Sequence, residues 1–144
     1  MKRSRLIITI SAIAFFAIGF FAWEIAEIRQ FAGEYVAVDA HDSAYELNLS
    51  RTGQISVVDI GAGNPALEGY IFRNPFAAGS GRYYLRSSGE TDDAFLDLGE
   101  NKGKASVWLS SLGQTDADDE PAVLRVITIE TGTDHMQFNE KGFE

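Results

Sequence analysis

The segment AYELNLSRTGQISVVDI, residues 44–60, decides the fold class of this chain. In its first half, Tyr45, Leu47 and Leu49 alternate with other residues, and this period of two is typical of a β-strand that buries one face. A second apolar run follows the residues SRTG, whose Gly53 suits the left-handed backbone conformation of a tight turn. The segment therefore predicts an antiparallel β-hairpin.

Similar short runs occur on both sides of this hairpin, separated by clusters of Gly, Pro, Asn, Asp and Ser. The further predicted strands are 34–38, 69–73, 82–86, 94–98, 104–109, 122–130 and 135–139. The residues after 30 show no amphipathic helical pattern. Short strands at this spacing predict an all-β domain, an antiparallel barrel or sandwich of about 8–9 strands.

The two ends of this β-rich region carry related signals. FAGEYVAVDAHDSAYELNLSRTGQISVV, residues 31–58, has a Gly-x-Tyr strand, a second strand, a Gly turn and a third strand. DHMQFNEKGFE, residues 134–144, has an aromatic residue two positions after a Met. These segments resemble the first and closing strands of small lipocalin-like (calycin-type) β-barrels. The resemblance implies either binding of a small apolar ligand or an accessory role in a cell envelope.

The N-terminal region is first basic and then apolar. Lys2, Arg3 and Arg5 precede the 18 uncharged residues 6–23. As a helix, at about 1.5 Å per residue, this run covers roughly 27 Å, which is close to the ~30 Å hydrocarbon core of a bilayer. Trp23 ends the run, where an indole ring prefers the headgroup layer. The sequence therefore predicts a helix that contacts the lipid bilayer through residues 6–23, with these cations and Trp23 at the two membrane interfaces.

The flanks of this run predict its orientation and the domain boundaries. The basic residues 1–5 are expected to form a cytoplasmic tail, because positive flanks stay inside. Residues 6–28 are interpreted as a transmembrane helix or signal anchor with a juxtamembrane turn. Residues 31–144 then form an exported acidic β-domain, and the chain is a single-pass membrane protein with a periplasmic or extracellular C-terminal domain.

The residues just after the span bear on whether it is removed. Glu24, Glu27 and Arg29 are expected to enter water. A cleaved signal peptide with a secreted β-protein is the alternative. The apolar run exceeds the about 7–15 residues usual for such a signal. The far end of the run also lacks a small-x-small cleavage site, because Phe20 precedes Ala22 at the position where a small residue is needed.

Charge and composition exclude several partners. The whole chain carries −9 at pH 7, and residues 1–29 carry +2, which leaves −11 for residues 30–144. Such a domain repels phosphate backbones and anionic headgroups, which argues against nucleic-acid binding and against flat adsorption of the domain onto a membrane. The chain has no cysteine and therefore no disulfide framework.

No catalytic constellation emerges from the sequence. His41 and His135 each lie beside an acidic residue, but a metal site needs three or four ligands, so this pair is only a weak metal candidate. The alternative is two solvated histidines. We find no paired nucleophile and base and no phosphate-binding glycine motif. The sequence thus predicts no catalytic residue and no cofactor, and the chain is not expected to be an enzyme.

Aromatic residues gather in the middle of the predicted β-domain. Tyr83 and Tyr84 are adjacent, so in a strand their side chains point to opposite faces and one of them leaves the core. Aromatic residues on both faces indicate either ordinary packing between sheets or an exposed apolar patch, and large exposed patches mark ligand or partner surfaces. The candidate ligand- or partner-contacting residues are Tyr70, Phe72, Tyr83, Tyr84 and Trp108.

Two functions remain open from these features. The first is a non-enzymatic, membrane-anchored accessory or interaction module that presents an acidic β-domain outside the cytoplasm, next to another membrane or envelope protein. The alternative is a lipocalin-like carrier of a small apolar ligand or lipid. In a carrier, the residues expected to line the barrel interior are Tyr70, Phe72, Tyr83 and Trp108.

Overall fold

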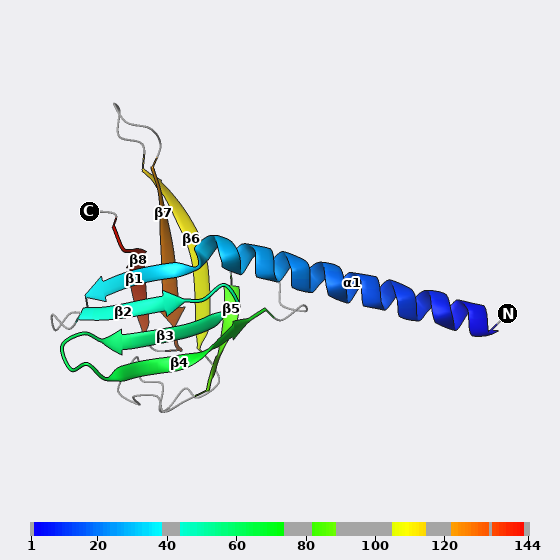
Figure 1. Cartoon of the computed structure of the whole chain (residues 1–144), viewed down its shortest axis with the longest axis horizontal. Coiled ribbons are helices and arrows are strands. Elements are labelled where there is room, and N and C mark those ends of the chain that lie inside the picture. The colour runs from blue at the N-terminus through cyan, green and yellow to red at the C-terminus, as the bar shows by residue number, and fades with distance from the viewer. Residues whose placement is uncertain are drawn as a thin grey trace.

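A computed structural model describes residues 2–38, 44–73, 82–88, 105–114, 122–132 and 134–142. These residues form one long helix followed by an antiparallel, closed β-barrel (Figure 1). The helix, α1, spans Lys2–Phe31. The strands are β1 (Gly33–Val38), β2 (Ala44–Leu49), β3 (Gln54–Asp59), β4 (Pro65–Phe72), β5 (Arg82–Ser87), β6 (Ser106–Gln114), β7 (Ala122–Glu130) and β8 (His135–Glu140).

The barrel is an up-and-down meander. Each strand pairs with the next one along the chain, and β8 returns to pair with β1, where Tyr35 lies opposite Glu140. Closure matters because an open sheet of short strands would expose unpaired edges. The sequence left barrel and sandwich open, and the structure has the barrel.

The hairpin at 44–60 is confirmed. Leu49 of β2 lies opposite Ile55 of β3. In the turn between them, the Oγ of Ser50 accepts a hydrogen bond from the backbone N–H of Gln54, at 3.0 Å. Gly53 has a φ of +89°, the left-handed conformation that its place in the turn requires.

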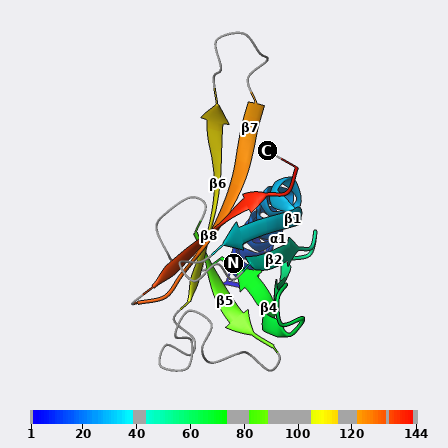
Figure 2. The same cartoon turned by 90° about the vertical axis from the view of Figure 1, so that its left-hand side faces the viewer.

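Two strands differ from their sequence predictions by several residues at one end. β4 begins at Pro65 rather than at 69. A proline is tolerated at this position because it is the first residue of the strand. β6 continues to Gln114 rather than ending at 109. Its second half pairs only with β7, where the two strands extend beyond the rest of the barrel (Figure 2). A two-stranded ribbon buries neither face, so it lacks the apolar alternation that marks the other strands. The predicted strand 94–98 lies outside the described residues.

The barrel interior is filled by alternate side chains from all eight strands. The largest of these, Tyr35, Tyr83 and Phe138, have no solvent-accessible surface. The other fully buried side chains are Leu47, Leu49, Ile55, Leu67, Ile127, Ile129, Val57 and Val107. β4 and β5 approach closely at Gly69, where any Cβ would lie 2.4 Å from the carbonyl oxygen of Arg86.

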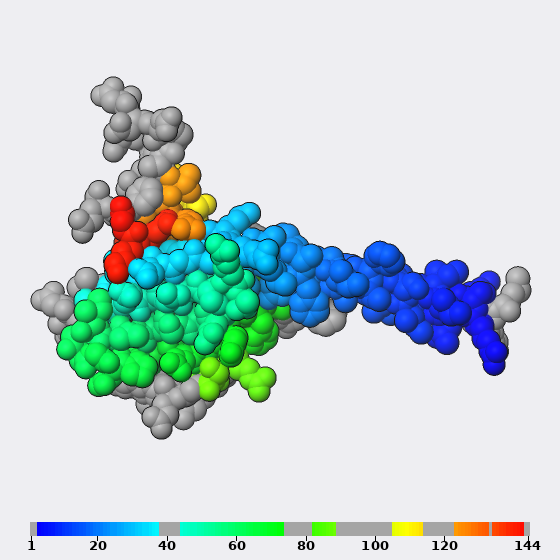
Figure 3. Space-filling model, in the orientation of Figure 1, coloured from blue at the N-terminus to red at the C-terminus, as the bar shows by residue number. Residues whose placement is uncertain are grey.

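The helix projects from the barrel as a single rod (Figure 3). Residues 3–31 are long and apolar enough to cross a membrane, and the most apolar part is not buried against the barrel. The juxtamembrane turn expected within 6–28 is not formed, because α1 continues without interruption to Phe31. Arg3 and Arg5 lie exposed in the first turns, and Lys2 begins the helix.

Candidate functional site

The last two turns of α1 dock one face into the barrel. Glu24 and Ile28 are one turn apart and are only 7% and 3% exposed, and Glu27 lies on the same side of the helix. Ile28 belongs to the barrel core. Its Cδ1 lies 3.4 Å from the position that a Cβ on Gly53 would occupy, so the β2–β3 turn is in direct contact with the helix. The expectation that Glu24 enters water was wrong, Glu27 is only half-buried, and Arg29 is exposed as expected.

Arg73, directly after β4, is the partner of both glutamates. Its backbone N–H donates to Oε1 of Glu24 at 2.8 Å, and its guanidinium donates to Oε2 of Glu27 at 2.7 Å. The guanidinium carbon lies 4.2 Å from the ring centroid of Trp23 and 4.9 Å from that of Tyr83. The Nε of Arg73 is buried without a hydrogen-bond acceptor among the described residues. The arginine is thus clamped between the helix and the barrel wall.

Tyr83 completes this cluster from inside the barrel. Its hydroxyl donates to Oε2 of Glu27 at 2.9 Å, so this single carboxylate oxygen accepts from both Arg73 and Tyr83. Burial is the main cause that raises the pKa of Tyr83, and the hydrogen bond to Glu27 raises this pKa further. We call Glu24, Glu27, Arg73 and Tyr83 the junction cluster.

A second set of contacts holds the end of the helix, where backbone carbonyls lack partners within the helix. The hydroxyl of Tyr35 donates to the carbonyl of Phe31 at 2.6 Å, and Arg125 donates to the carbonyl of Gln30. Arg125 also pairs with Glu140, with 2.9 Å between its Nε and Oε2 of the carboxylate. This ion pair lowers the pKa of Glu140, and a cation at this end also matches the helix dipole.

The buried tyrosines predict a loss of stability in alkali. Burial raises the pKa of Tyr35 from 10.0 to about 12, and the pKa of Tyr83 is raised as well. A raised folded-state pKa contributes stability that is full below pH 10 and is lost as the pH rises through the folded-state pKa. We expect the melting temperature of the full chain in detergent to fall steeply from pH 10 to 12, and Tyr35→Phe to make this fall shallower.

The matched control for this prediction is Tyr70→Phe. The Tyr70 side chain is 47% exposed on the outer face of the barrel, so its replacement should leave the alkaline profile unchanged. Tyr35→Phe should also lower stability near pH 7 by about 1 kcal/mol, because it removes one hydrogen bond. An identical alkaline slope in the Tyr35→Phe and Tyr70→Phe variants would contradict the assignment.

The aromatic residues singled out from the sequence divide between the two faces of the barrel wall. Tyr83 points into the core and Tyr84 points outward, as their adjacency predicted. Tyr70 and Phe72 of β4 are 47% and 45% exposed, and Trp108 of β6 is 36% exposed. We call the four outward residues, Tyr70, Phe72, Tyr84 and Trp108, the outer aromatic surface.

Neighbouring strands bring parts of this surface together. Phe72 lies opposite Tyr84 in the β4–β5 pairing, with ring centroids 5.9 Å apart. Trp108 lies opposite Arg82, whose guanidinium carbon is 5.3 Å from the ring centroid. The indole N–H of Trp108 donates to Oε2 of Glu130 at 2.9 Å. Trp108 is therefore held in one orientation while part of its ring stays in solvent.

The barrel interior does not match the lining expected for a carrier. Tyr70, Phe72 and Trp108 lie on the outer surface, so they do not line the interior. Tyr83 alone of the expected set lies inside, and its hydroxyl is bonded to Glu27. Tyr35 and Phe138 occupy the same interior without accessible surface.

Of the weak metal candidate pair, the structure describes only His135. His135 is exposed at the start of β8, and its backbone N–H is bonded to the carboxylate of Asp134. His41 lies outside the described residues. No group of three or more His, Asp or Glu residues that could hold a metal ion occurs in the part of the chain that the structure describes.

Sequence reasoning singled out Tyr83 but missed the other members of the junction cluster, although one signal for them exists. Glu24, Glu27 and Ile28 have the i, i+3, i+4 spacing of a single helix face. Arg73 carries no comparable signal, because it stands at the end of a predicted strand and its partners are 46 and 49 residues away. Only the closed barrel brings it to the helix.

Comparisons with known proteins give no match: no family model, no curated protein and no solved structure is similar to this chain.

Proposed function

We propose that this chain is a single-span membrane protein whose helix holds a β-barrel domain directly against the outer surface of the membrane. Residues 6–23 of α1 cross the bilayer, and residues 24–31 form part of the barrel domain. The domain acts as a non-enzymatic accessory or interaction module for another membrane or envelope protein. The observation that carries this proposal is the burial of Glu24 and Ile28 against the barrel.

The buried junction supports a retained anchor over a cleaved signal. A cut after Ala22 or after Ala26 would fall inside the continuous helix α1. A cut after Ala26 would also remove Glu24 and its hydrogen bond to Arg73. Cleavage would leave the remaining residues of the helix end as a short, frayed terminus, because isolated helices of this length are marginal.

A rigid junction also suits an interaction module. No linker separates the span from the barrel, since the same helix serves both. The barrel therefore presents the outer aromatic surface at a fixed height and angle relative to the bilayer. Trp108 is the strongest candidate contact for a protein partner, because Trp is enriched among interface hot spots and this partly exposed ring is already held in place by Glu130 and Arg82.

Topology and processing are tested together in cells that express the full chain. We expect the membrane-extracted protein to retain residues 1–30 by intact mass. The chain has no natural cysteine, so a Glu68→Cys variant should react with a membrane-impermeant maleimide from outside the cell. A Phe15→Cys variant, within the proposed span, should not react. A mature chain that starts after residue 22 or 26, or labelling of Glu68→Cys only after lysis, would contradict the proposal.

The lipocalin-like resemblance supports a second candidate function. A closed up-and-down barrel of eight strands is an architecture that lipocalins share, and Phe138, in the segment that resembles their closing strand, is fully buried. A carrier would need the interior side chains to move aside. A fluorescent fatty acid that shifts on binding the full chain in detergent, and that Tyr83→Ala affects, would favour the carrier over the interaction module.

A further inference from the structure

The end of β4 lies at the same depth as the membrane-facing end of the junction. Trp23 closes the apolar run of α1, and its ring contacts the guanidinium of Arg73. Phe72 directly precedes Arg73, and consecutive Cα atoms are about 3.8 Å apart. The backbone N–H of Arg73 also donates to Glu24, the residue after Trp23, so the last residue of β4 lies close to the level of Trp23 along the membrane normal.

The junction cluster prevents this end of β4 from moving away from the helix. Arg73 is bonded to Glu24 through its backbone and to Glu27 through its side chain. These two contacts join one point of the barrel wall to two positions on the same helix face that are less than one turn apart. A tryptophan at the end of a span prefers the headgroup layer, so the rigid contact carries the neighbouring barrel residues into that layer.

Four of the described side chains near this level are of types that favour a lipid interface. Phe72 is 45% exposed, and Tyr84, opposite it, faces outward. Arg86 follows on the same outer face of β5, and Arg51 lies in the β2–β3 turn that contacts the helix. Both arginines are exposed. We call Arg51, Phe72, Tyr84 and Arg86 the helix-side rim.

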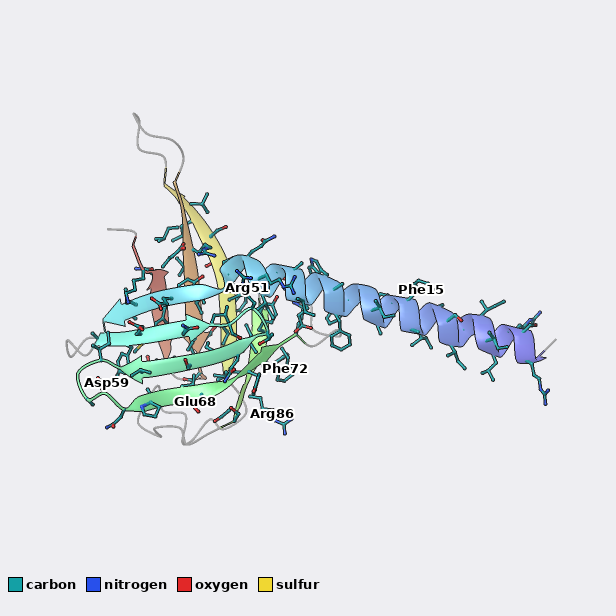
Figure 4. The ribbon with its side chains drawn as sticks, in the orientation of Figure 1. Phe15, Arg51, Asp59, Glu68, Phe72 and Arg86 are labelled. Carbon is teal, nitrogen blue, oxygen red and sulfur yellow. The ribbon has the colours of Figure 1, made fainter. Side chains whose placement is uncertain are left out.

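Two exposed cations of the barrel lie on the side of the helix. Figure 4 shows Arg51, Phe72 and Arg86 on the side from which the helix leaves, and Asp59 at the opposite end. The net charge of −11 over residues 30–144 argues against adsorption of the domain as a whole. It does not oppose contact through the two arginines of the rim, because at physiological salt the repulsion from acidic groups more than about 8 Å away is largely screened.

We propose that the helix-side rim rests on the headgroups of the membrane that α1 spans, with Phe72 and Tyr84 among the headgroups and with Arg51 and Arg86 on the phosphates of anionic phospholipids. This inference rests on the proposed function, since it needs α1 to cross the bilayer. The rim then acts as a second membrane contact that sets the tilt of the barrel and leaves Trp108 for a protein partner.

Depth-dependent quenching tests the proposal on the full chain. Because the chain has no cysteine, single variants Phe15→Cys, Phe72→Cys and Asp59→Cys can each carry one bimane fluorophore. The chains are reconstituted in vesicles of phosphatidylcholine and phosphatidylglycerol that contain lipids with a nitroxide on the headgroup or on the acyl chain. We expect acyl-chain quenching at position 15, headgroup quenching at position 72 and no loss of fluorescence at position 59.

The outcomes separate this inference from the proposed function. Absence of acyl-chain quenching at position 15 would overturn the membrane span itself. Quenching at position 15 with none at position 72 would overturn the rim contact alone. Quenching at position 15 alone is also the result expected if the rim binds a protein partner in the cell and does not contact lipid.

The arginine contacts are tested in the Phe72→Cys background. The double change Arg51→Gln and Arg86→Gln should reduce headgroup quenching at position 72 in the anionic vesicles, and vesicles of phosphatidylcholine alone should give the same reduction without any substitution. Lys141→Gln is the matched control, because Lys141 is an exposed cation that pairs with Glu34 and Glu46. Undiminished quenching in the double variant would overturn the phosphate contacts.

Discussion

Replacement of Arg73 by methionine is expected to lower the unfolding free energy of the barrel domain by about 3 kcal/mol. Removing one partner from a buried ion pair leaves an uncompensated charge, which typically costs about 3–5 kcal/mol. We take the lower end because the Glu27 side chain is still 19% exposed. Denaturant unfolding of the full chain in detergent, followed by circular dichroism of the strands, measures this loss.

The control for Arg73→Met is Arg82→Met. Arg82 is an exposed cation of the barrel wall that also lies near an aromatic ring, and its removal should cost about 0.5 kcal/mol or less, as exposed charges usually do. Adding Glu27→Met to Arg73→Met should recover part of the loss, because apolar replacement of both partners is close to neutral. If Arg73→Met and Arg82→Met cost the same, the junction cluster does not hold the helix to the barrel.

Replacement of Ile28 by alanine is expected to destabilise the barrel domain by about 2–4 kcal/mol. The side chain of Ile28 is 3% exposed and belongs to the barrel core. Its truncation removes buried apolar surface and leaves a cavity beneath the β2–β3 turn, and both effects lower stability. The same unfolding measurement in detergent reports the change.

Ile25, three residues earlier on the same helix, provides the matched comparison. Its side chain is 43% exposed, so Ile25→Ala should change the unfolding free energy by about 0.5 kcal/mol or less. Equal effects of the two substitutions would mean that the helix end is not part of the core. A cleaved signal peptide would then explain the apolar run as well as an anchor does.

Local pattern was enough to predict the strands whose faces differ in polarity. Leu47, Leu49 and Ile55 alternate with residues that point outward, and the turn at Gly53 needs a left-handed residue. The apolar run 6–23 was equally sufficient to predict one long apolar helix, because helix length and side-chain polarity are local properties. The second half of β6 was missed, since a strand with both faces exposed leaves no periodic trace.

Local sequence pattern predicts the arrangement of the candidate site residues only in part. The adjacency of Tyr83 and Tyr84 predicts that they diverge, and the structure confirms it. Which of the two enters the core depends on the register of β5 against β4 and β6. Placing Phe72 and Trp108 on the outer surface depends on that register too.

The sequence by itself determined a β-domain built from hairpins after one long apolar helix. Both the alternation of apolar and polar residues and the length of an apolar run depend only on residues that are close together in the sequence. Only the tertiary structure decided that Glu24 is buried and that Glu27 is half-buried, with both carboxylates bonded to the barrel. Next to an apolar run, a glutamate is expected in water unless a partner satisfies it. That partner, Arg73, comes to the helix only when the strands close into a barrel, and such long-range burial has no signature in local sequence.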